Sequence, residues 1–195
     1  MRGLRASEVD TAARMLGRAF FGDPGATFVE PDPARRAAAN GAVFAAVLRF
    51  ALVAGDVVTT PELDAVAVWL PPERPSPTEA DLIAAGFEHA VEIMGPQASA
   101  RMATMNAHFE TIQALAIAEP HWHLALIGVE PERQGRGLGS ALIAPGHARA
   151  DSRGQRCYLE TFTESDVAFY SRRGYDVKAE APLPGTDVPV RGMVR

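Results

Sequence analysis

The segment Ile127–Leu142 constrains this chain most strongly, because it joins a strand-like run to a helical pattern through a glycine-dense turn. The apolar run His123–Val129 is typical of a buried strand, and apolar residues recur at helical spacing after the turn. The glycines of the turn occupy alternate positions, Gly135, Gly137 and Gly139. A helix that starts there leaves backbone N–H groups free at its positive end, and glycine lets the backbone approach a phosphate closely. The segment therefore predicts a cradle for an anion such as pyrophosphate, with Arg133 and Arg136 adding positive charge nearby.

Two common nucleotide-binding patterns do not fit this turn. A Walker A loop requires a lysine followed by serine or threonine, and the only lysine of the chain is Lys178. A dinucleotide fingerprint requires Gly-x-Gly-x-x-Gly with an acidic residue about 20 positions further on. Here the glycine spacing differs, and Glu160 comes slightly too late. The pattern that fits is Gln/Arg-x-x-Gly-x-Gly/Ala, met by Gln134, Gly137 and Gly139.

Length and composition are those of an ordinary globular chain. The 195 residues suit one domain with a single core, and 47% hydrophobic with 22% charged residues is typical of soluble proteins. The net charge of −5 argues against nucleic acid or an anionic membrane as the main partner. The chain does not start like a signal peptide, and Arg49 interrupts the apolar stretch 43–54, so we expect a cytoplasmic protein. The single cysteine, Cys157, lies in an apolar run, and we interpret it as a buried hydrophobic residue rather than a nucleophile.

The order of the apolar patterns predicts an α/β (α+β) fold. Helical patterns dominate the first part of the chain, and strands and helices alternate after Pro120. The expected helices are 7–21, 33–53, 79–94, 98–117, 137–151 and 164–173, and the expected strands are 2–6, 57–60, 65–70, 121–129, 156–161, 174–180 and 188–194. Gly22–Gly25 is expected to form a turn, with Phe28 and Val29 in the loop after it. We therefore expect a central mixed sheet of about six to seven strands flanked by helices.

His121 and His123 are two positions apart on an expected strand, so both side chains should point to the same face of the sheet. Histidine can hold or relay protons at neutral pH, because its ordinary pKa is about 6.5. A zinc site would need a third and a fourth ligand, and the sequence offers none nearby, so we expect no metal. Two alternatives stay open: a catalytic base or proton relay, and two structural histidines beside Trp122.

Tyr170 is the second candidate catalytic residue. An expected strand ends at Glu160-Thr161, and Tyr170 lies on the short helix that follows, which Gly174 ends. A phenol has an ordinary pKa of about 10, so it stays protonated at neutral pH and can give its proton to a thiolate leaving group. The alternative is that Tyr170 packs under the sheet together with Phe169.

Several segments together resemble the GNAT superfamily of N-acetyltransferases. The segments that carry the resemblance are 122–129, 134–140, 159–161 and 169–175, the last reading Phe-Tyr-x-Arg-x-Gly-Tyr. Within the superfamily, the chain is most similar to the puromycin N-acetyltransferases, through the segments 65–69, 72–73, 119–120 and 145–146. The resemblance implies the GNAT fold, a single GNAT domain over residues 1–195, and acetyl-CoA as co-substrate.

The resemblance also implies roles for individual residues. The backbone N–H of Val129 would polarise the thioester carbonyl, and Tyr170 would be the general acid that protonates the CoA thiolate. Thr163, with Asp166, stands where the family often has asparagine. The residues expected to contact coenzyme A are Ile127, Gly128, Val129, Gln134, Gly135, Arg136, Gly137, Leu138, Gly139, Ser140, Thr163 and Tyr170.

The His-x-His pair is similar to one that arylalkylamine acetyltransferases carry on the same strand. An alkylammonium must lose a proton before it attacks, so His123 or His121 is the expected base or relay, with Glu130 and Glu160 as competitors. The expected acceptor pocket lies between the region 20–28 and the helices of residues 79–117. Its candidate apolar walls are Phe20, Phe21, Phe28 and Trp69, with packing in the core as the alternative for these residues.

The expected function is transfer of acetyl from acetyl-CoA to a primary amine of a small molecule by direct attack. An aminonucleoside antibiotic and an arylalkylamine are the candidate acceptors, the first of which would make the chain a resistance enzyme. The alternatives are a protein or peptide N-acetyltransferase and a non-catalytic acyl-CoA-binding regulatory module. We expect a monomer or homodimer that binds neither nucleic acid nor membrane.

Overall fold

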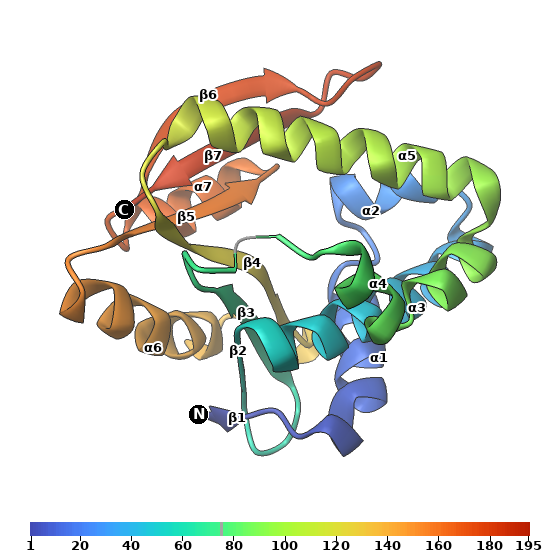
Figure 1. The fold of residues 1–195 in the computed structure, drawn as a ribbon, viewed down its shortest axis with the longest axis horizontal. Coiled ribbons are helices and arrows are strands. Elements are labelled where there is room, and N and C mark those ends of the chain that lie inside the picture. The colour runs from blue at the N-terminus through green and yellow to red at the C-terminus, as the bar shows by residue number, and fades with distance from the viewer. Residues whose placement is uncertain (75) are drawn as a thin grey trace.

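The structure, a computed structural model, describes residues 1–74 and 76–195, and its centre is one seven-stranded sheet with helices on both faces (Figure 1). The strands are β1 (Arg2–Gly3), β2 (Asp56–Thr59), β3 (Ala65–Leu70), β4 (His121–Val129), β5 (Arg156–Thr161), β6 (Asp176–Pro182) and β7 (Pro189–Val194). The helices are α1 (Val9–Ala19), α2 (Pro24–Val29), α3 (Pro33–Ala54), α4 (Glu79–Ala85), α5 (Phe87–Ala116), α6 (Leu138–Ser152) and α7 (Glu164–Ser171), with short 3₁₀ turns at Ala6–Glu8 and Pro131–Arg133. The predicted fold class is confirmed.

The strands follow the order β1-β2-β3-β4-β5-β7-β6, and β4 pairs with β5 in parallel. That parallel pairing joins only His121–His123 to Arg156–Tyr158. Beyond these residues β4 continues along β3, whereas β5 continues along β7, so the two strands diverge. A β-bulge in β4, at Ala125, lies where the divergence begins. The sheet is therefore open at its centre.

Side chains alternate between the two faces of the sheet along each strand, and apolar side chains cover both faces. Leu126 of β4 packs with residues of α1 and α3 on one face, whereas Trp122 and Leu124 pack with residues of α6 and α7 on the other. The bulge at Ala125 explains why Leu124 and Leu126 lie on opposite faces. α5 lies on the face of α1 and α3 and crosses the end of the sheet formed by β6 and β7 (Figure 1).

α3 is the one described helix that is long and apolar enough, by length and composition, to cross a membrane. In the sequence, Arg49 argued against such a segment. In the fold, α3 packs against both α1 and α5. Ala46, Leu48 and Ala51 of α3 are completely buried in these contacts. This is the position of a core helix, which passes the same test of length and composition.

The structure differs from the predicted elements in three places. The expected loop after Asp23 is instead helix α2, whose first N–H groups are capped because the Asp23 carboxylate accepts from the Ala26 N–H at 3.0 Å. An aspartate followed by proline is a helix-start pattern, which the turn interpretation overlooked. The expected helix 79–94 is divided at Gly86, whose φ of +80° ends α4. The predicted break near Gly95 is a kink inside α5.

Candidate active site

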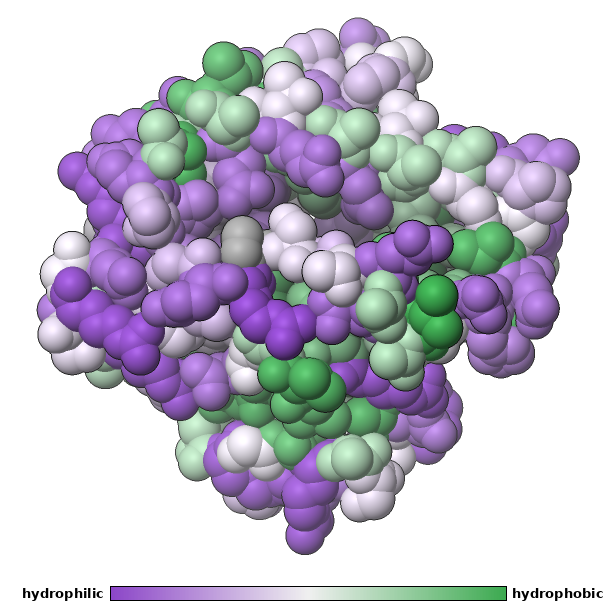
Figure 2. Space-filling model, in the orientation of Figure 1, coloured by the Kyte–Doolittle hydropathy of each residue, from purple (hydrophilic) through white to green (hydrophobic). Residues whose placement is uncertain are grey.

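Where β4 and β5 diverge, the sheet opens into a cavity of about 870 Å³. Its walls come from the end of α1 and the start of α2, from α3 and α5, from β4 with the glycine turn, and from the end of β5 with α7. The surface below α5 is visibly hollowed in Figure 2. The cavity therefore joins the predicted anion cradle to the face covered by α3 and α5.

One edge of β4 presents backbone N–H groups to this cavity. The Glu130 N–H donates to the Asp64 carbonyl at 2.8 Å, which makes these two residues a hydrogen-bonded pair of the antiparallel ladder. Because such pairs alternate along a ladder, the N–H groups of Ile127 and Val129 point away from β3 and toward the opening. Val129, the predicted oxyanion donor, has the orientation that this role requires, and Ile127 shares it.

The glycine turn forms the entrance to α6. Gly135 and Gly137 have φ values of +75° and +82°, in the left-handed region that favours glycine. The first helical hydrogen bond of α6 runs from the Ala141 N–H to the Gly137 carbonyl at 3.1 Å, so the N–H groups of the three preceding residues have no helical acceptor. A Cβ at Gly135 or Gly137 would meet no heavy atom within 4 Å. Free donors, the helix dipole and open space together fit a phosphate group.

The residues predicted to contact the coenzyme all line this cavity, with one exception. That exception is Arg136, whose guanidinium donates to the Glu132 carbonyl at 3.3 Å instead. Gln134 links the turn to the strand, because its side-chain amide donates to the Val129 carbonyl at 3.2 Å. Thr163 caps α7 through its hydroxyl, which accepts from the Asp166 N–H at 3.2 Å. The coenzyme contacts themselves remain predictions.

Positive charge beside the turn comes mainly from an arginine that the sequence reasoning missed. Arg133 forms an ion pair with Asp64 at 2.9 Å, so its charge is partly neutralised. Arg173 instead stacks on the Phe169 ring, 3.5 Å from its centroid, and donates to the Ser140 hydroxyl. Burial lowers the pKa of this guanidinium from its ordinary value, although it stays charged at neutral pH. Arg173 therefore places a cation at the start of α6.

Tyr170 lines the cavity from α7 with a side chain that is only 7% exposed. Its ring packs against Phe169 and Tyr175, at centroid distances of 5.1 and 5.8 Å, and its role as a general acid stays a prediction. Burial, and then the nearby Asp166 carboxylate, raise the pKa of the phenol above its ordinary value. Tyr170 therefore carries a proton at any pH near neutrality, as a general acid must.

His121 and His123 do point to the same face, because both rings contact the Tyr158 ring, at 5.4 and 5.3 Å. Neither histidine lines the cavity. The His121 Nδ1–H donates to the Glu119 carbonyl at 2.7 Å, and its Nε2 accepts from the Gln113 amide at 2.8 Å. With both nitrogens engaged, and with its pKa lowered by burial, His121 has the contacts of a neutral structural histidine.

His123 reaches the cavity through Glu160. The His123 Nε2–H donates to the Glu160 carboxylate at 2.8 Å, and both side chains are largely buried. Glu160 itself lines the cavity, at the point where β5 leaves β4. Of the candidate bases, Glu160 is thus the group that a substrate amine could touch, and His123 stands behind it. Glu130, the other candidate base, forms an ion pair with Arg18 at 2.5 Å.

We predict that Glu160→Gln lowers kcat/KM for amine acetylation on the order of 10²-fold, because the amide cannot take the proton of an alkylammonium. His123→Ala should lower the rate less, because it removes the hydrogen-bond partner of the carboxylate and leaves the carboxylate itself in place. Both changes would be read from initial rates at saturating acetyl-CoA. Unchanged rates in both variants would exclude this pair from proton transfer.

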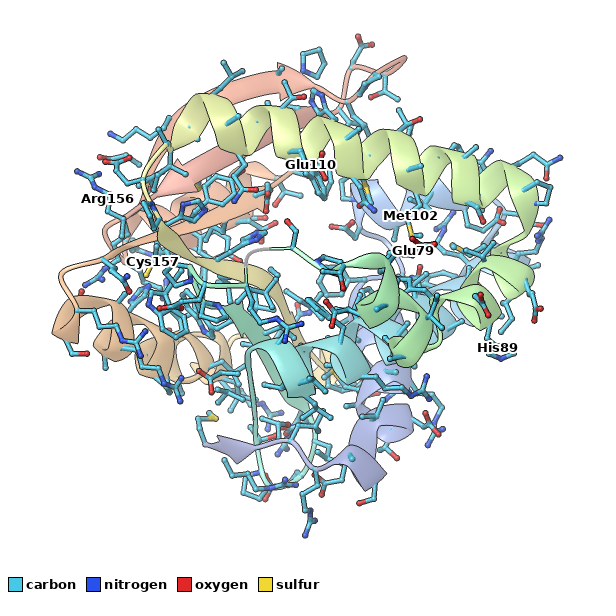
Figure 3. The ribbon with its side chains drawn as sticks, viewed as in Figure 1. Glu79, His89, Met102, Glu110, Arg156 and Cys157 are labelled. Atoms are coloured by element: carbon cyan, nitrogen blue, oxygen red, sulfur yellow. The ribbon has the colours of Figure 1, made fainter. Side chains whose placement is uncertain are left out.

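The cavity beyond Glu160 is a chamber with mostly apolar walls. Its apolar side chains come from the end of α1, from α3, from α5 and from the segment after β5: Phe20, Val43, Phe44, Val47, Met94, Met102, Met105, Phe109 and Phe162. Met102, labelled in Figure 3, lies on the side of α5 that faces α3. Two polar side chains, Asp23 and Asn40, also line this chamber.

Three of the four aromatic residues expected to form the acceptor pocket lie elsewhere. Phe20 lines the chamber, but Phe21 is 39% exposed on the surface and Phe28 packs behind the wall. Trp69 is fully buried on the opposite face, where a Cβ at Gly146 would lie 2.2 Å from its ring. The aromatic pattern alone did not reveal which face each side chain would occupy.

Asp23 is a partly buried carboxylate held at the chamber. Burial raises its pKa from 3.8 to about 6, with Asp166 contributing and the N–H groups of α2 opposing the rise. Because the folded-state pKa lies above the unfolded one, the folded state favours the protonated form. This stabilising contribution is complete below about pH 4 and is lost as the pH rises through 6.

Asp23→Asn should therefore stabilise the protein at pH 8 by about 1–2 kcal/mol, because asparagine caps a helix equally well without a buried charge. The gain should shrink as the pH falls and disappear below about pH 4. Urea unfolding of both proteins at pH 4 and pH 8 measures this difference. A gain that is equal at both pH values would show that ionisation of Asp23 is not its source.

Cys157 is buried, and burial raises the pKa of its thiol to about 11. This agrees with its interpretation as a core residue rather than a nucleophile. Among residues 1–74 and 76–195, no group of three or more histidine, cysteine, aspartate and glutamate side chains is placed to hold a metal ion.

The chain is similar to known acetyltransferases in both sequence and fold. Residues 99–177 match the family model described as acetyltransferase (GNAT) domain. Over 99% of this chain and 93% of the other, the fold matches a histone acetyltransferase HPA2 and related acetyltransferase from Corynebacterium glutamicum, at 24% identity and a TM-score of 0.66. It also matches arylalkylamine N-acetyltransferase 2 from Aedes aegypti, over 100% and 96% of the two chains, at 14% identity and a TM-score of 0.57.

A third similar structure is the C-terminal condensation domain of Ebony in complex with beta-alanyl-dopamine, with 7% identity, a TM-score of 0.67, and coverage of 100% and 96%. At such identities the structural matches establish the shared fold. Residues 99–177 are therefore similar to a GNAT acetyltransferase domain, and the chain as a whole shares the fold of the acetyltransferases that it matches.

Proposed function

We propose that this chain, as a single GNAT domain, transfers acetyl from acetyl-CoA to the primary amine of a small molecule by direct attack. The observation that carries the proposal is the continuity of one cavity. It runs from the free N–H groups of the glycine turn, past the β4 edge and Tyr170, to a chamber bordered by Glu160. Both substrates could thus occupy the same cavity, as direct transfer requires.

The coenzyme end of this cavity suits acetyl-CoA. The N–H groups at the start of α6, with Arg173 beside them, would bind the pyrophosphate. The backbone edge at Ile127 and Val129 would bind the acyl arm, and an N–H there would stabilise the oxyanion that forms on the thioester carbonyl.

The proton transfers follow from the positions of Glu160 and Tyr170. Glu160 takes a proton from the bound alkylammonium, and the His123 Nε2–H positions the Glu160 carboxylate through their hydrogen bond. The neutral amine attacks the thioester carbon, forming the C–N bond and a tetrahedral oxyanion. Collapse of this intermediate breaks the C–S bond, and Tyr170 protonates the departing thiolate. The attacking nitrogen loses its second proton, so the net products are an amide, CoA thiol and one proton.

The identity of the acceptor amine is the more specific part of the proposal. The similar structures are named for a histone acetyltransferase, an arylalkylamine acetyltransferase and a condensation domain bound to beta-alanyl-dopamine, so their names do not agree on a substrate. The apolar walls of the chamber favour a small amine with an apolar body over a protein side chain. The puromycin-like and arylalkylamine-like sequence segments support the same choice, with antibiotic inactivation as one version. We also propose a cytoplasmic monomer or homodimer.

An amine-panel assay with detection of the released CoA thiol tests this function. The panel contains puromycin, phenethylamine, spermidine and a lysine-containing peptide. We expect saturable thiol release with at least one small apolar amine and little with the peptide. A preference for the peptide would favour a protein acetyltransferase, and acetyl-CoA binding without amine-dependent release would favour a regulatory module.

A further inference from the structure

Asn40 is a polar residue of the chamber wall that the proposed reaction does not use. It lies on α3, is only 7% exposed, and lines the cavity. Its side-chain amide nitrogen is buried without a hydrogen-bond partner among the described residues. Buried polar groups nearly always have partners, so an unpaired amide on a residue that lines the cavity suggests that a ligand supplies the partner, after a rotation of the side chain that turns the amide toward it.

Asn40 is surrounded by apolar residues on its face of α3. The residues of α3 that share its face and line the cavity are Val43, Phe44 and Val47, at the spacing of one helical stripe. Asn40 is thus a single amide in an apolar stripe. Burying an amide there is unfavourable unless something satisfies it, so its presence is not explained by packing.

α5 forms the wall of the chamber against which the apolar part of the ligand would pack. Met94, Met102, Met105 and Phe109 line the cavity from that side. Methionine side chains are flexible and polarizable, so this wall can adapt to an aromatic or aliphatic group. The described residues of α3 and α5 that line the cavity include no carboxylate.

The charges of the cavity are separated along its length. Arg133, Arg172 and Arg173 lie at the coenzyme end, whereas the carboxylates of the cavity, Asp23, Glu160 and Asp166, come from elements other than α3 and α5. One ammonium group can therefore be held near Glu160. A further positive charge beside α3 and α5, away from these carboxylates, would be pressed against apolar walls at a high desolvation cost.

We propose that the acceptor is a monoamine with an apolar, ring-sized body that carries a neutral hydrogen-bonding group, and that Asn40 binds this group and selects for it. The inference rests on the proposed acetyl transfer and names the substrate class of that same cavity. Asn40 is accordingly a specificity-determining residue and not a catalytic one.

Three amines with the same ring and amine chain test the proposal. Phenethylamine lacks a neutral polar group, tyramine carries a hydroxyl at the far end of the ring, and 4-(2-aminoethyl)benzamide carries an amide there. We expect kcat/KM for at least one of the two polar amines to exceed that of phenethylamine by about tenfold or more. In Asn40→Leu this ratio should fall to near one, while the KM for acetyl-CoA stays unchanged.

The matched control is Asn106→Ala, an exposed asparagine of α5 that does not line the cavity. It should keep the wild-type ratio. If circular dichroism shows that Asn40→Leu is unfolded, the same ratio is measured with Asn40→Ser.

Three results would overturn the proposal: equal ratios in wild type and the Asn40 variant, preference for spermidine or a lysine peptide, and no acetylation of any of the three amines. If acetyl-CoA still binds in such a case, the proposed coenzyme site is unaffected and only the proposed class of acceptor is refuted. Loss of acetyl-CoA binding by the wild-type protein would instead refute the proposed function itself.

Discussion

Tyr170→Phe is expected to lower kcat by about 10²–10⁴-fold while leaving acetyl-CoA affinity unchanged. The reason is the leaving group: a CoA thiolate departs faster when a proton is delivered to it as the C–S bond breaks. Phenylalanine keeps the ring contacts with Phe169 and Tyr175 but has no proton to give. Steady-state rates together with calorimetric titration of acetyl-CoA separate the two effects.

Tyr175→Phe is the matched control for this variant. The Tyr175 hydroxyl bonds His147 at 3.0 Å in the core and does not line the cavity. Its removal should cost some stability, about 1 kcal/mol for a lost hydrogen bond, with little change in kcat. Full activity of Tyr170→Phe would show that another group, or water, protonates the thiolate.

Gly137→Val should abolish acetyl-CoA binding, weakening it by about 100-fold or more. At φ +82°, Gly137 occupies the left-handed region, where a β-branched residue is strongly disfavoured. The valine would therefore shift the turn away from the geometry that aims its N–H groups, and its side chain would fill the open space beside them. Calorimetric titration with acetyl-CoA measures the loss directly.

Backbone strain alone is controlled by Gly154→Val. Gly154 lies in the turn after the C-terminal end of α6 and has a φ of +61°. A Cβ at this position would also meet no heavy atom within 4 Å. The two variants should lose similar stability, but only Gly137→Val should lose the coenzyme. Equal acetyl-CoA affinities in both would place the coenzyme somewhere other than this turn.

The glycine turn and the strand before it could be predicted from sequence because their pattern is local. Glycine at alternate positions after an apolar run leaves few conformations, and the structure places Gly137 in the left-handed region at the start of α6. α3 and β5 were also predicted almost to their ends, since long helical spacing and a short apolar run are clear patterns. α2 was missed because its six residues show little periodicity.

The chamber could not be predicted in the same way, because its residues meet only in the folded chain. Asn40 is on α3, Asp23 precedes α2, and Glu160 ends β5, so no local spacing connects them. The His-x-His pair drew attention to β4, but the pairing with Glu160 depends on how β4 and β5 separate. Arg173 was overlooked for a similar reason, since its stacking on Phe169 brings it to Ser140 on another helix.

The most direct test of the whole account is the initial-rate pattern when acetyl-CoA and an accepted amine are varied together. Direct transfer within one cavity requires both substrates to be bound at once, so double-reciprocal plots should intersect. No acetylated protein should be detectable by mass spectrometry, in keeping with the buried Cys157. Parallel plots with an acetylated enzyme would contradict the account, because they would show that acetyl passes through a covalent intermediate.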